Sequence, residues 1–167
     1  MTESSLLRPI TPGDHALVLD LNETNVELLA PLDEPRLVEL VAAAETAAVI
    51  SHEGRDVGFV ITFADGAGID GPNFEWFSAR HPGFLYLDRI VLDASARRTG
   101  IGSRVYDELE ARAAERGPVL CLEVNIEPPN DASLAFHRAR GFVEVGQQEA
   151  NGHVVSLMEK RVGPPGS

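Results

Sequence analysis

A six-residue loop carries the clearest chemical signal in the sequence. Arg97-Arg98-Thr99-Gly100-Ile101-Gly102 joins a predicted strand to a predicted helix. Glycines let the backbone turn so that its N–H groups point into one concavity, and the start of a helix adds partial positive charge. Because Arg97, Arg98 and Arg104 add full charges, the loop is a candidate site for a phosphate or pyrophosphate. A plain glycine turn with solvated arginines stays open as the alternative.

Two familiar nucleotide-binding motifs do not fit this loop. A P-loop needs a lysine followed by Ser or Thr, and the loop contains no lysine. A dinucleotide fingerprint needs glycines directly after the strand and a third small residue; here a loop from Asp93 intervenes and Val105 takes the third place. The sequence therefore disfavours both motifs.

The elements that would position the loop are predicted from apolar periodicity. Helical spacing starts at Asp14, a candidate N-cap, and extends to about Val26; further helices are predicted over 35–45, 100–116 and 131–140. Strands are predicted over 6–11, 46–52, 57–63, 84–92, 119–125, 142–148 and 154–161, the last two forming a hairpin turned at Asn151-Gly152. Residues 64–83, with the aromatic stretch 73–77, are predicted to be a long connection. This order predicts an α+β fold, a mixed central sheet of about seven strands flanked by about four helices.

Composition narrows the class of protein. The 167 residues suit one domain, predicted over 1–162 with a flexible tail at 163–167. The net charge of −12 argues against binding to nucleic acid, and no segment has the length and apolarity of a membrane span or the profile of a signal peptide. Cys121 is the single cysteine, which excludes an internal disulfide and suits a reducing compartment. We therefore expect a cytoplasmic protein.

Two motifs together resemble the GNAT family of N-acetyltransferases. The pyrophosphate loop of that family is Gln/Arg-x-x-Gly-x-Gly/Ala, which Arg97 to Gly102 satisfies. Its second landmark, Asn-x-x-Ala/Ser followed by an aromatic pair and Gly-Phe, is similar to residues 130–142, which read NDASLAFHRARGF. The two motifs stand in the right order, so together they are more specific than either alone. The resemblance covers 84–142 closely, and segments 86–91 and 123–125 resemble an uncharacterised bacterial branch of the family.

The resemblance implies an enzyme that moves an acetyl group from acetyl-CoA to a primary amine by direct attack on the thioester, without a metal. Backbone groups of Ile90, Val91 and Leu92 would pair with the pantetheine arm. The loop would bind the pyrophosphate through Arg97, Arg98, Thr99, Gly100, Ile101, Gly102 and Ser103. Asn130 would bind the pantetheine or position the loop that does, and Ser133 belongs to the same expected cofactor-binding set.

Direct transfer requires removal of a proton from the ammonium and protonation of the departing thiolate. The family usually has a tyrosine as general acid where this chain has His137, and we hypothesise that His137 is the acid. The alternatives are that it only orients the thioester or is a surface helix histidine. For the base, Asp88 is a carboxylate in an otherwise apolar strand, which is costly unless the group is used or forms a salt bridge, with Arg89 or another arginine as the candidate partner. Glu123 with Asn125 is a second candidate, and Cys121 is expected to lie in the core.

The sequence indicates least about the site that binds the amine acceptor. Asn22, Glu23, Asn25 and Glu27 lie in the first helical region, where the family builds part of its acceptor site. The aromatic residues of 73–77 could form an acceptor pocket, a hydrophobic cover or a dimer contact. A non-catalytic acyl-CoA-binding regulatory module is the main alternative function, and a nucleotide-binding regulatory domain is a weaker one. A homodimer is expected from family habit alone.

Overall fold

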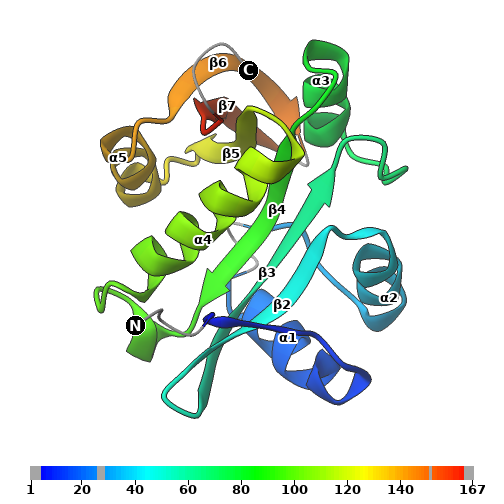
Figure 1. The fold of residues 1–167 in the computed structure, drawn as a ribbon, viewed down its shortest axis with the longest axis vertical. Coiled ribbons are helices and arrows are strands. Elements are labelled where there is room, and N and C mark those ends of the chain that lie inside the picture. The colour runs from blue at the N-terminus through cyan, green and yellow to red at the C-terminus, as the bar shows by residue number, and fades with distance from the viewer. Residues whose placement is uncertain (1–4, 26–28, 151, 164–167) are drawn as a thin grey trace. The chain divides into compact units, whose positions relative to one another are not determined.

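The computed structural model describes residues 5–25, 29–150 and 152–163 (Figure 1). Val26, Glu27, Asn151 and most of the predicted tail lie outside these ranges. The elements are β1 (Leu7–Pro9), α1 (His15–Glu23), α2 (Glu34–Ala43), β2 (Thr46–His52), β3 (Arg55–Ala64), α3 (Pro72–Arg80), β4 (Leu85–Leu92), α4 (Ile101–Arg116), β5 (Val119–Glu127), α5 (Asp131–Ala139), β6 (Val143–Ala150) and β7 (His153–Arg161).

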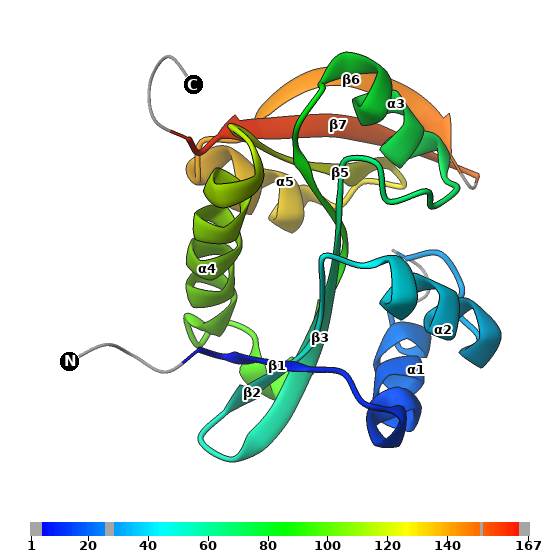
Figure 2. The same cartoon turned by 45° about the vertical axis from the view of Figure 1, so that its right-hand side comes forward.

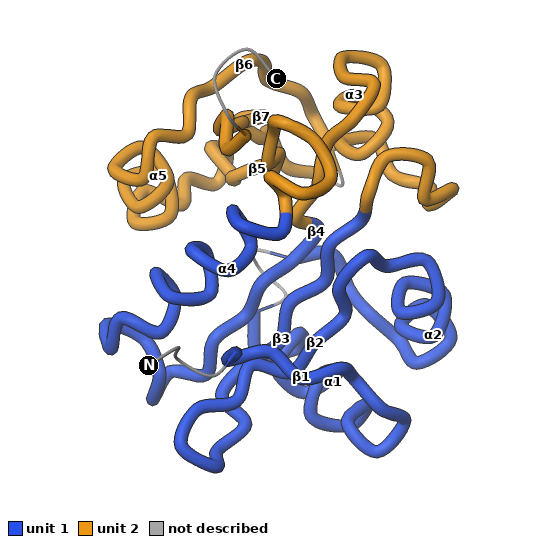
Figure 3. Tube along the Cα trace, viewed as in Figure 1, with its two compact units in different colours: residues 1–63, 88–112 blue, residues 64–87, 113–167 orange. Residues whose placement is uncertain are grey.

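The strands form one mixed seven-stranded sheet in the order β1-β2-β3-β4-β5-β7-β6. The α+β prediction and all seven predicted strands are therefore confirmed, and β5 is an interior strand, as its continuous apolar run indicates. The chain divides into two compact units, Met1–Phe63 with Asp88–Arg112 and Ala64–Leu87 with Ala113–Ser167 (Figure 3). Each unit combines two separate stretches of the chain, and β4 begins in the second unit and ends in the first.

The first unit is built on the antiparallel strands β1, β2 and β3. Helices α1 and α2 lie on one side of these strands and the first turns of α4 lie on the other (Figure 2). Every residue of β3 from Val57 onward is buried, because the strand has neighbours on both edges and helices on both faces. A Cβ atom on Gly58 would lie 2.2 Å from the carbonyl oxygen of Val91, so only glycine fits where β3 passes the end of β4.

The second unit is built on β5, which pairs in parallel with the start of β4 and antiparallel with β7. Strand β6 pairs with β7 as the predicted hairpin. Helix α3 packs on this sheet: Trp76 lies so close to Gly146 of β6 that a Cβ atom there would come within 2.6 Å of the indole ring.

Helix α3 corrects the prediction of a long connection over 64–83. Pro72 occupies the first turn, where its missing N–H costs nothing, and Asn73, Phe74 and Phe77 form the buried face. The glycines and acidic residues before Pro72 obscured a helix of only nine residues. Phe74 and Phe77 pack against Tyr86 with ring centroids 5.7 and 6.1 Å apart, so both belong to the core, as the hydrophobic-cover alternative expects.

Asp14 also differs from its predicted role as the N-cap of the first helix. The residue precedes α1, but its side chain makes no capping hydrogen bond to that helix. The carboxylate instead accepts hydrogen bonds from the backbone N–H of Thr11 at 2.8 Å and from both terminal nitrogens of Arg8 at 2.9 Å. Asp14 therefore fixes the turn that leads from β1 into α1. Of the helices in the described part of the chain, none combines the length and apolarity that a membrane crossing requires.

Candidate functional site

The predicted anion-binding loop follows directly from the end of β4 in the first unit. Asp93 opens a short turn over Ala94–Ala96 by accepting a hydrogen bond from the backbone N–H of Ser95 at 2.7 Å. This contact, with one from the Ser95 hydroxyl, lowers the pKa of Asp93, so the cap stays charged at neutral pH. The buried side chain of Ala96 then anchors the loop, whereas Arg97, Arg98, Thr99 and Gly100 are all exposed.

The loop backbone is shaped by two residues in the left-handed region, Arg98 at φ +63° and Gly100 at φ +85°. Between them, the hydroxyl of Thr99 donates to the carbonyl of Ala96 and fixes the turn. Helix α4 starts at Ile101, with the Arg104 N–H bonded to the Gly100 carbonyl at 3.1 Å. An exposed turn that ends at the start of a sixteen-residue helix is the arrangement that binds a phosphate or pyrophosphate group.

Two arginines tie the loop and β4 to the end of α1. Arg97 donates to the side-chain oxygen of Asn25 at 3.0 Å. Arg89 donates to the side-chain oxygen of Asn22 at 3.0 Å and to the carbonyl of Ala30 at 3.3 Å. Asn22 is 1% exposed, so this is a buried polar connection that holds the α1 end against the strand.

Asp88 takes part in the same network. Its carboxylate accepts a hydrogen bond from Arg89 Nε at 2.8 Å, and the two side chains are 22% and 9% exposed. The ion pair expected as the structural alternative for Asp88 is therefore present, and the partner is the next residue of the same strand. Ile90, Val91 and Leu92 follow, so the predicted pantetheine-binding segment leads straight into the loop.

In the second unit, Asn130 and Ser133 form the start of α5. The Asn130 side chain caps the helix by accepting a hydrogen bond from the backbone N–H of Ser133 at 3.3 Å. The backbone N–H of Asn130 donates to the Asn125 carbonyl at 3.0 Å. This capping use of the side chain fits the second of the two expected roles, positioning the loop before the helix.

His137 lies one turn further along α5 and is 6% exposed, so the alternative of a surface helix histidine is wrong. Its Nδ1 lies 2.7 Å from the Ser133 carbonyl, which can only accept, so Nδ1 carries a proton and Nε2 is the acceptor of the neutral ring. The ring packs edge-on against Phe142, with centroids 5.3 Å apart. Burial lowers the pKa of His137, and Arg140 adds to this effect, while the bond to Ser133 opposes it.

The second candidate base of the sequence, Glu123, has a partner that sequence reasoning missed. The hydroxyl of Tyr86, a side chain 2% exposed, donates to the Glu123 carboxylate at 2.6 Å. Tyr86 lies opposite Cys121 in the parallel register of β4 and β5, and Glu123 is the next residue on the same face of β5. The available signal was a tyrosine and a glutamate on consecutive strands separated by one crossover helix.

The acetyltransferase (GNAT) family model matches residues 16–142, most of the chain. The chain belongs to this family. It is accordingly an acyl-CoA N-acyltransferase, and the enzyme class implied by the two sequence motifs is confirmed. A search of curated protein sequences finds no match.

Solved structures of other acetyltransferases share the fold. One acetyltransferase crystal structure is 25% identical, with a TM-score of 0.64, and the match covers 95% of this chain and 100% of that one. The putative acetyltransferase yncA from Salmonella typhimurium, solved with acetyl-CoA, is 15% identical with a TM-score of 0.68 and coverages of 96% and 95%. Naa50 from Arabidopsis thaliana, solved with a CoA-peptide bisubstrate analogue, is 14% identical with a TM-score of 0.68 and coverages of 92% and 96%.

Within this GNAT enzyme, the sequence-predicted site residues fall into separate groups. In the first unit, the loop from Arg97 to Ser103 directly follows the β4 segment that contains Asp88. In the second unit, α5 gathers Asn130, Ser133 and His137 within one helix and its cap. Tyr86 is the addition of the structure, as the hydrogen-bond partner of Glu123, whereas Arg89 is the partner of Asp88 that the salt-bridge alternative named.

Proposed function

We propose that this chain is a single GNAT-like domain over residues 1–162 that transfers the acetyl group of acetyl-CoA to a primary amine. The observation that carries the proposal is the loop from Arg97 to Ser103 at the start of α4, exposed from Arg97 to Gly100. Two of the similar structures hold acetyl-CoA or a CoA analogue, which supports acetyl-CoA as the cosubstrate.

The loop has the features that a pyrophosphate needs. Its backbone amides lie just before and within the first turn of α4, where an N–H group has no carbonyl four residues earlier in the helix. The left-handed turns at Arg98 and Gly100 let successive amides point the same way, and the exposed Arg98 side chain adds charge. A local positive site of this kind lets a protein of net charge −12 hold an anion.

The remaining cosubstrate-binding roles are assigned residue by residue. The backbone of Ile90, Val91 and Leu92 pairs with the pantetheine arm. Asn130 and Ser133 position the chain before α5, with Ser133 also giving its carbonyl to His137.

The chemistry needs a base for the attacking amine. Glu123 is the stronger candidate, because Asp88 is held by the neighbouring Arg89 whereas Glu123 is held by a phenol that can itself carry a proton. In the reaction the carboxylate takes a proton from the ammonium, the amine nitrogen bonds to the acetyl carbon, and the carbon–sulfur bond breaks. The nitrogen, now bonded to the acetyl carbon, gives its second proton to water, which passes a proton to the departing thiolate.

His137 orients the thioester rather than acting as the acid. A neutral ring whose Nδ1–H is given to Ser133 has no proton to donate from Nε2, and burial favours that neutral form. This choice between the two expected roles rests on the burial of the ring and on its hydrogen bond.

The deciding experiment combines ligand binding with turnover. Acetyl-CoA and CoA, but not ATP or NADH, are expected to raise the unfolding midpoint, by about 2.7 kcal/mol of added stability at 100 times the dissociation constant. Release of free CoA with a panel of primary amines then measures transfer. Stabilisation by ATP or NADH alone would contradict the loop assignment. Binding of acetyl-CoA without turnover across the panel would favour the non-catalytic acyl-CoA-binding module.

A further inference from the structure

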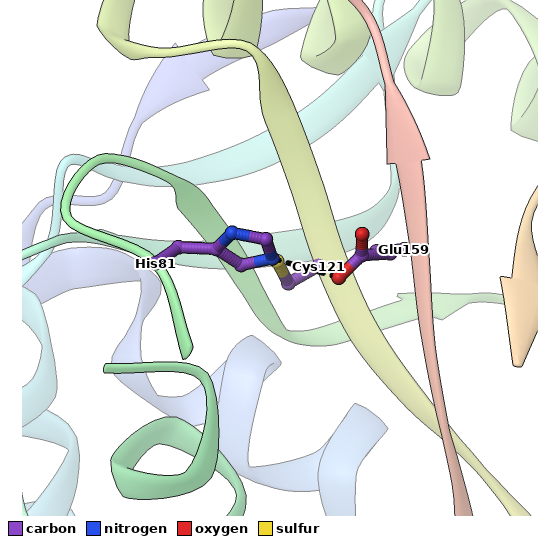
Figure 4. Close-up of side chains that lie close together, drawn as sticks. All are labelled: His81, Cys121 and Glu159. Atoms are coloured by element: carbon purple, nitrogen blue, oxygen red, sulfur yellow. Dashed lines mark hydrogen bonds and ion pairs between the residues drawn. The ribbon is translucent and has the colours of Figure 1, made fainter. Parts of the chain in front are cut away.

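Three side chains with metal-binding atoms meet in the second unit, and none of the three has a role in the acetyl transfer proposed above. His81 directly follows α3, Cys121 lies on β5 and Glu159 lies on β7 (Figure 4). Cys121 and Glu159 are direct partners in the antiparallel register of β5 and β7, so their side chains leave the sheet on the same face. The imidazole, thiol and carboxylate atoms all lie within 4.8 Å of one another.

Two of the three groups are buried, and His81 is half-buried. Cys121 is 0% exposed and Glu159 is 8% exposed. His81 Nε2 lies 2.7 Å from Glu159 Oε1, which is a hydrogen-bond distance. Donor atoms around a tetrahedral zinc ion stand about 3.5 Å apart, as bond lengths of about 2.0 to 2.3 Å require, so small side-chain rotations would convert the cluster into a coordination site.

We propose that His81, Cys121 and Glu159 bind a zinc ion, with a water molecule as the fourth ligand. One thiolate, one imidazole and one carboxylate form a set that suits a borderline-soft divalent metal and does not suit magnesium or calcium. The thiolate and the carboxylate together balance the charge of the ion.

Arg80 fits the site as an outer partner. Its Nε donates to Glu159 Oε1 at 2.9 Å, and hydrogen bonds of this kind orient the carboxylates that ligate metals. The positive charge of Arg80 weakens the binding of a cation at this site. The Arg80 side chain is 42% exposed, however, so the surrounding solvent screens its charge.

Binding requires a defined exchange of protons. Without a metal the thiol of Cys121 is protonated, because burial and the nearby Glu159 raise its pKa. When the metal binds, the S–H bond breaks and the proton goes to the buffer. The imidazole presents the Nε2 lone pair with its hydrogen on Nδ1, so the hydrogen bond to Glu159 is replaced by coordination. The bound ion would then join the end of α3 to β5 and β7.

Cobalt(II) titration of the full chain without an affinity tag tests the site, because a thiolate bound to cobalt gives a charge-transfer absorption. Cys121 is the only cysteine, so the band can come from no other residue. We expect one cobalt per chain, displacement of cobalt by zinc, and a higher unfolding midpoint with zinc. The band should vanish in Cys121→Ser, and His81→Gln should weaken binding at least tenfold.

A matched control separates this site from ordinary histidine–carboxylate pairs. His15 lies 3.4 Å from the carboxylate of Glu34, and its variant His15→Gln should bind metal like the parent chain. Circular dichroism and acetyl-CoA binding check that each variant folds, and the partly exposed His81 position gives a variant that does not open the core. No band in the parent chain, or zinc affinity unchanged in folded His81→Gln, would overturn the proposal.

Discussion

The phenol of Tyr86 donates a hydrogen bond of 2.6 Å to the carboxylate of Glu123. The tyrosine is buried and packs against Phe74 and Phe77 of α3, so its hydroxyl is held at a fixed place. A rigid donor at this distance orients the carboxylate and offers a second group through which a proton can pass.

The first prediction is that Glu123→Gln lowers the turnover of amines by about 10² to 10⁴-fold, as expected for the loss of a general base. The amide keeps the shape and accepts the Tyr86 hydrogen bond but cannot take a proton. Affinity for acetyl-CoA, measured by thermal shift, should stay unchanged.

Asp88→Asn is the matched comparison for Glu123→Gln. It removes the ion pair with Arg89, so it should lower the free energy of unfolding and should lower turnover much less than Glu123→Gln does. Full activity in Glu123→Gln together with loss of turnover in folded Asp88→Asn would exchange the roles of the two carboxylates.

Interior strands were predictable from sequence because they are largely apolar runs bounded by turn residues, as in Thr46–His52. The loop from Arg97 to Gly102 was predictable because its signal is local. Helix α3 was not, since its buried face rests on Asn73, Phe74 and Phe77 within nine residues, too few to establish a period.

The partners of the candidate bases could be predicted only in part. That Asp88 needed an arginine follows from the cost of burying a charge, and Arg89 was among the candidates, but the further bond from Arg89 to Asn22 could not be read from the sequence. Tyr86 and Glu123 meet because of the parallel register of β4 and β5, which no local pattern encodes.

The second prediction concerns His137 and pH. Its pKa is lowered by burial, so the unfolded chain binds a proton in a pH range where the folded chain does not. Stability should therefore fall as pH drops below about 6.5, the ordinary value for histidine, and the fall should be shallower in His137→Phe. Chemical denaturation from pH 7.5 to 5 measures this.

The same variant also tests the catalytic role of His137. If the ring only orients the thioester, His137→Phe should lower turnover without changing the shape of the pH–rate profile. Disappearance of a limb on which the rate falls with rising pH would identify His137 as the general acid.

The third prediction concerns Asp14, whose pKa is held well below its ordinary value by hydrogen bonds from Arg8 and Thr11. The stabilisation is present above about pH 4 and is lost as the pH falls below the ordinary aspartate value. Asp14→Asn should cost about 1 kcal/mol at pH 7, the size of a lost capping contact, and less at pH 2, where part of the stabilisation has been lost.

Asp56 provides the control for Asp14. It also accepts from Arg8 at 2.9 Å, but both side chains of that pair are about two-fifths exposed, at 38% and 40%. Asp56→Asn should therefore change the free energy of unfolding by only a few tenths of a kcal/mol. Equal losses in the two variants would contradict the special role of Asp14.

The last prediction compares two glycines that have similar backbone conformations but lie in different parts of the fold. Gly100 (φ +85°) lies in the loop that we propose binds the pyrophosphate and Gly54 (φ +77°) in the β2–β3 turn, and a Cβ atom would meet nothing within 4 Å at either position. Gly100→Ala and Gly54→Ala should thus cost similar stability, about 1 kcal/mol, from left-handed strain alone. Only Gly100→Ala should raise the KM for acetyl-CoA, by about tenfold, because a shift of the Gly100 backbone moves the amides that hold the pyrophosphate. Steady-state kinetics beside chemical denaturation separates the two effects, and an equal KM in both variants would remove the loop from the binding site.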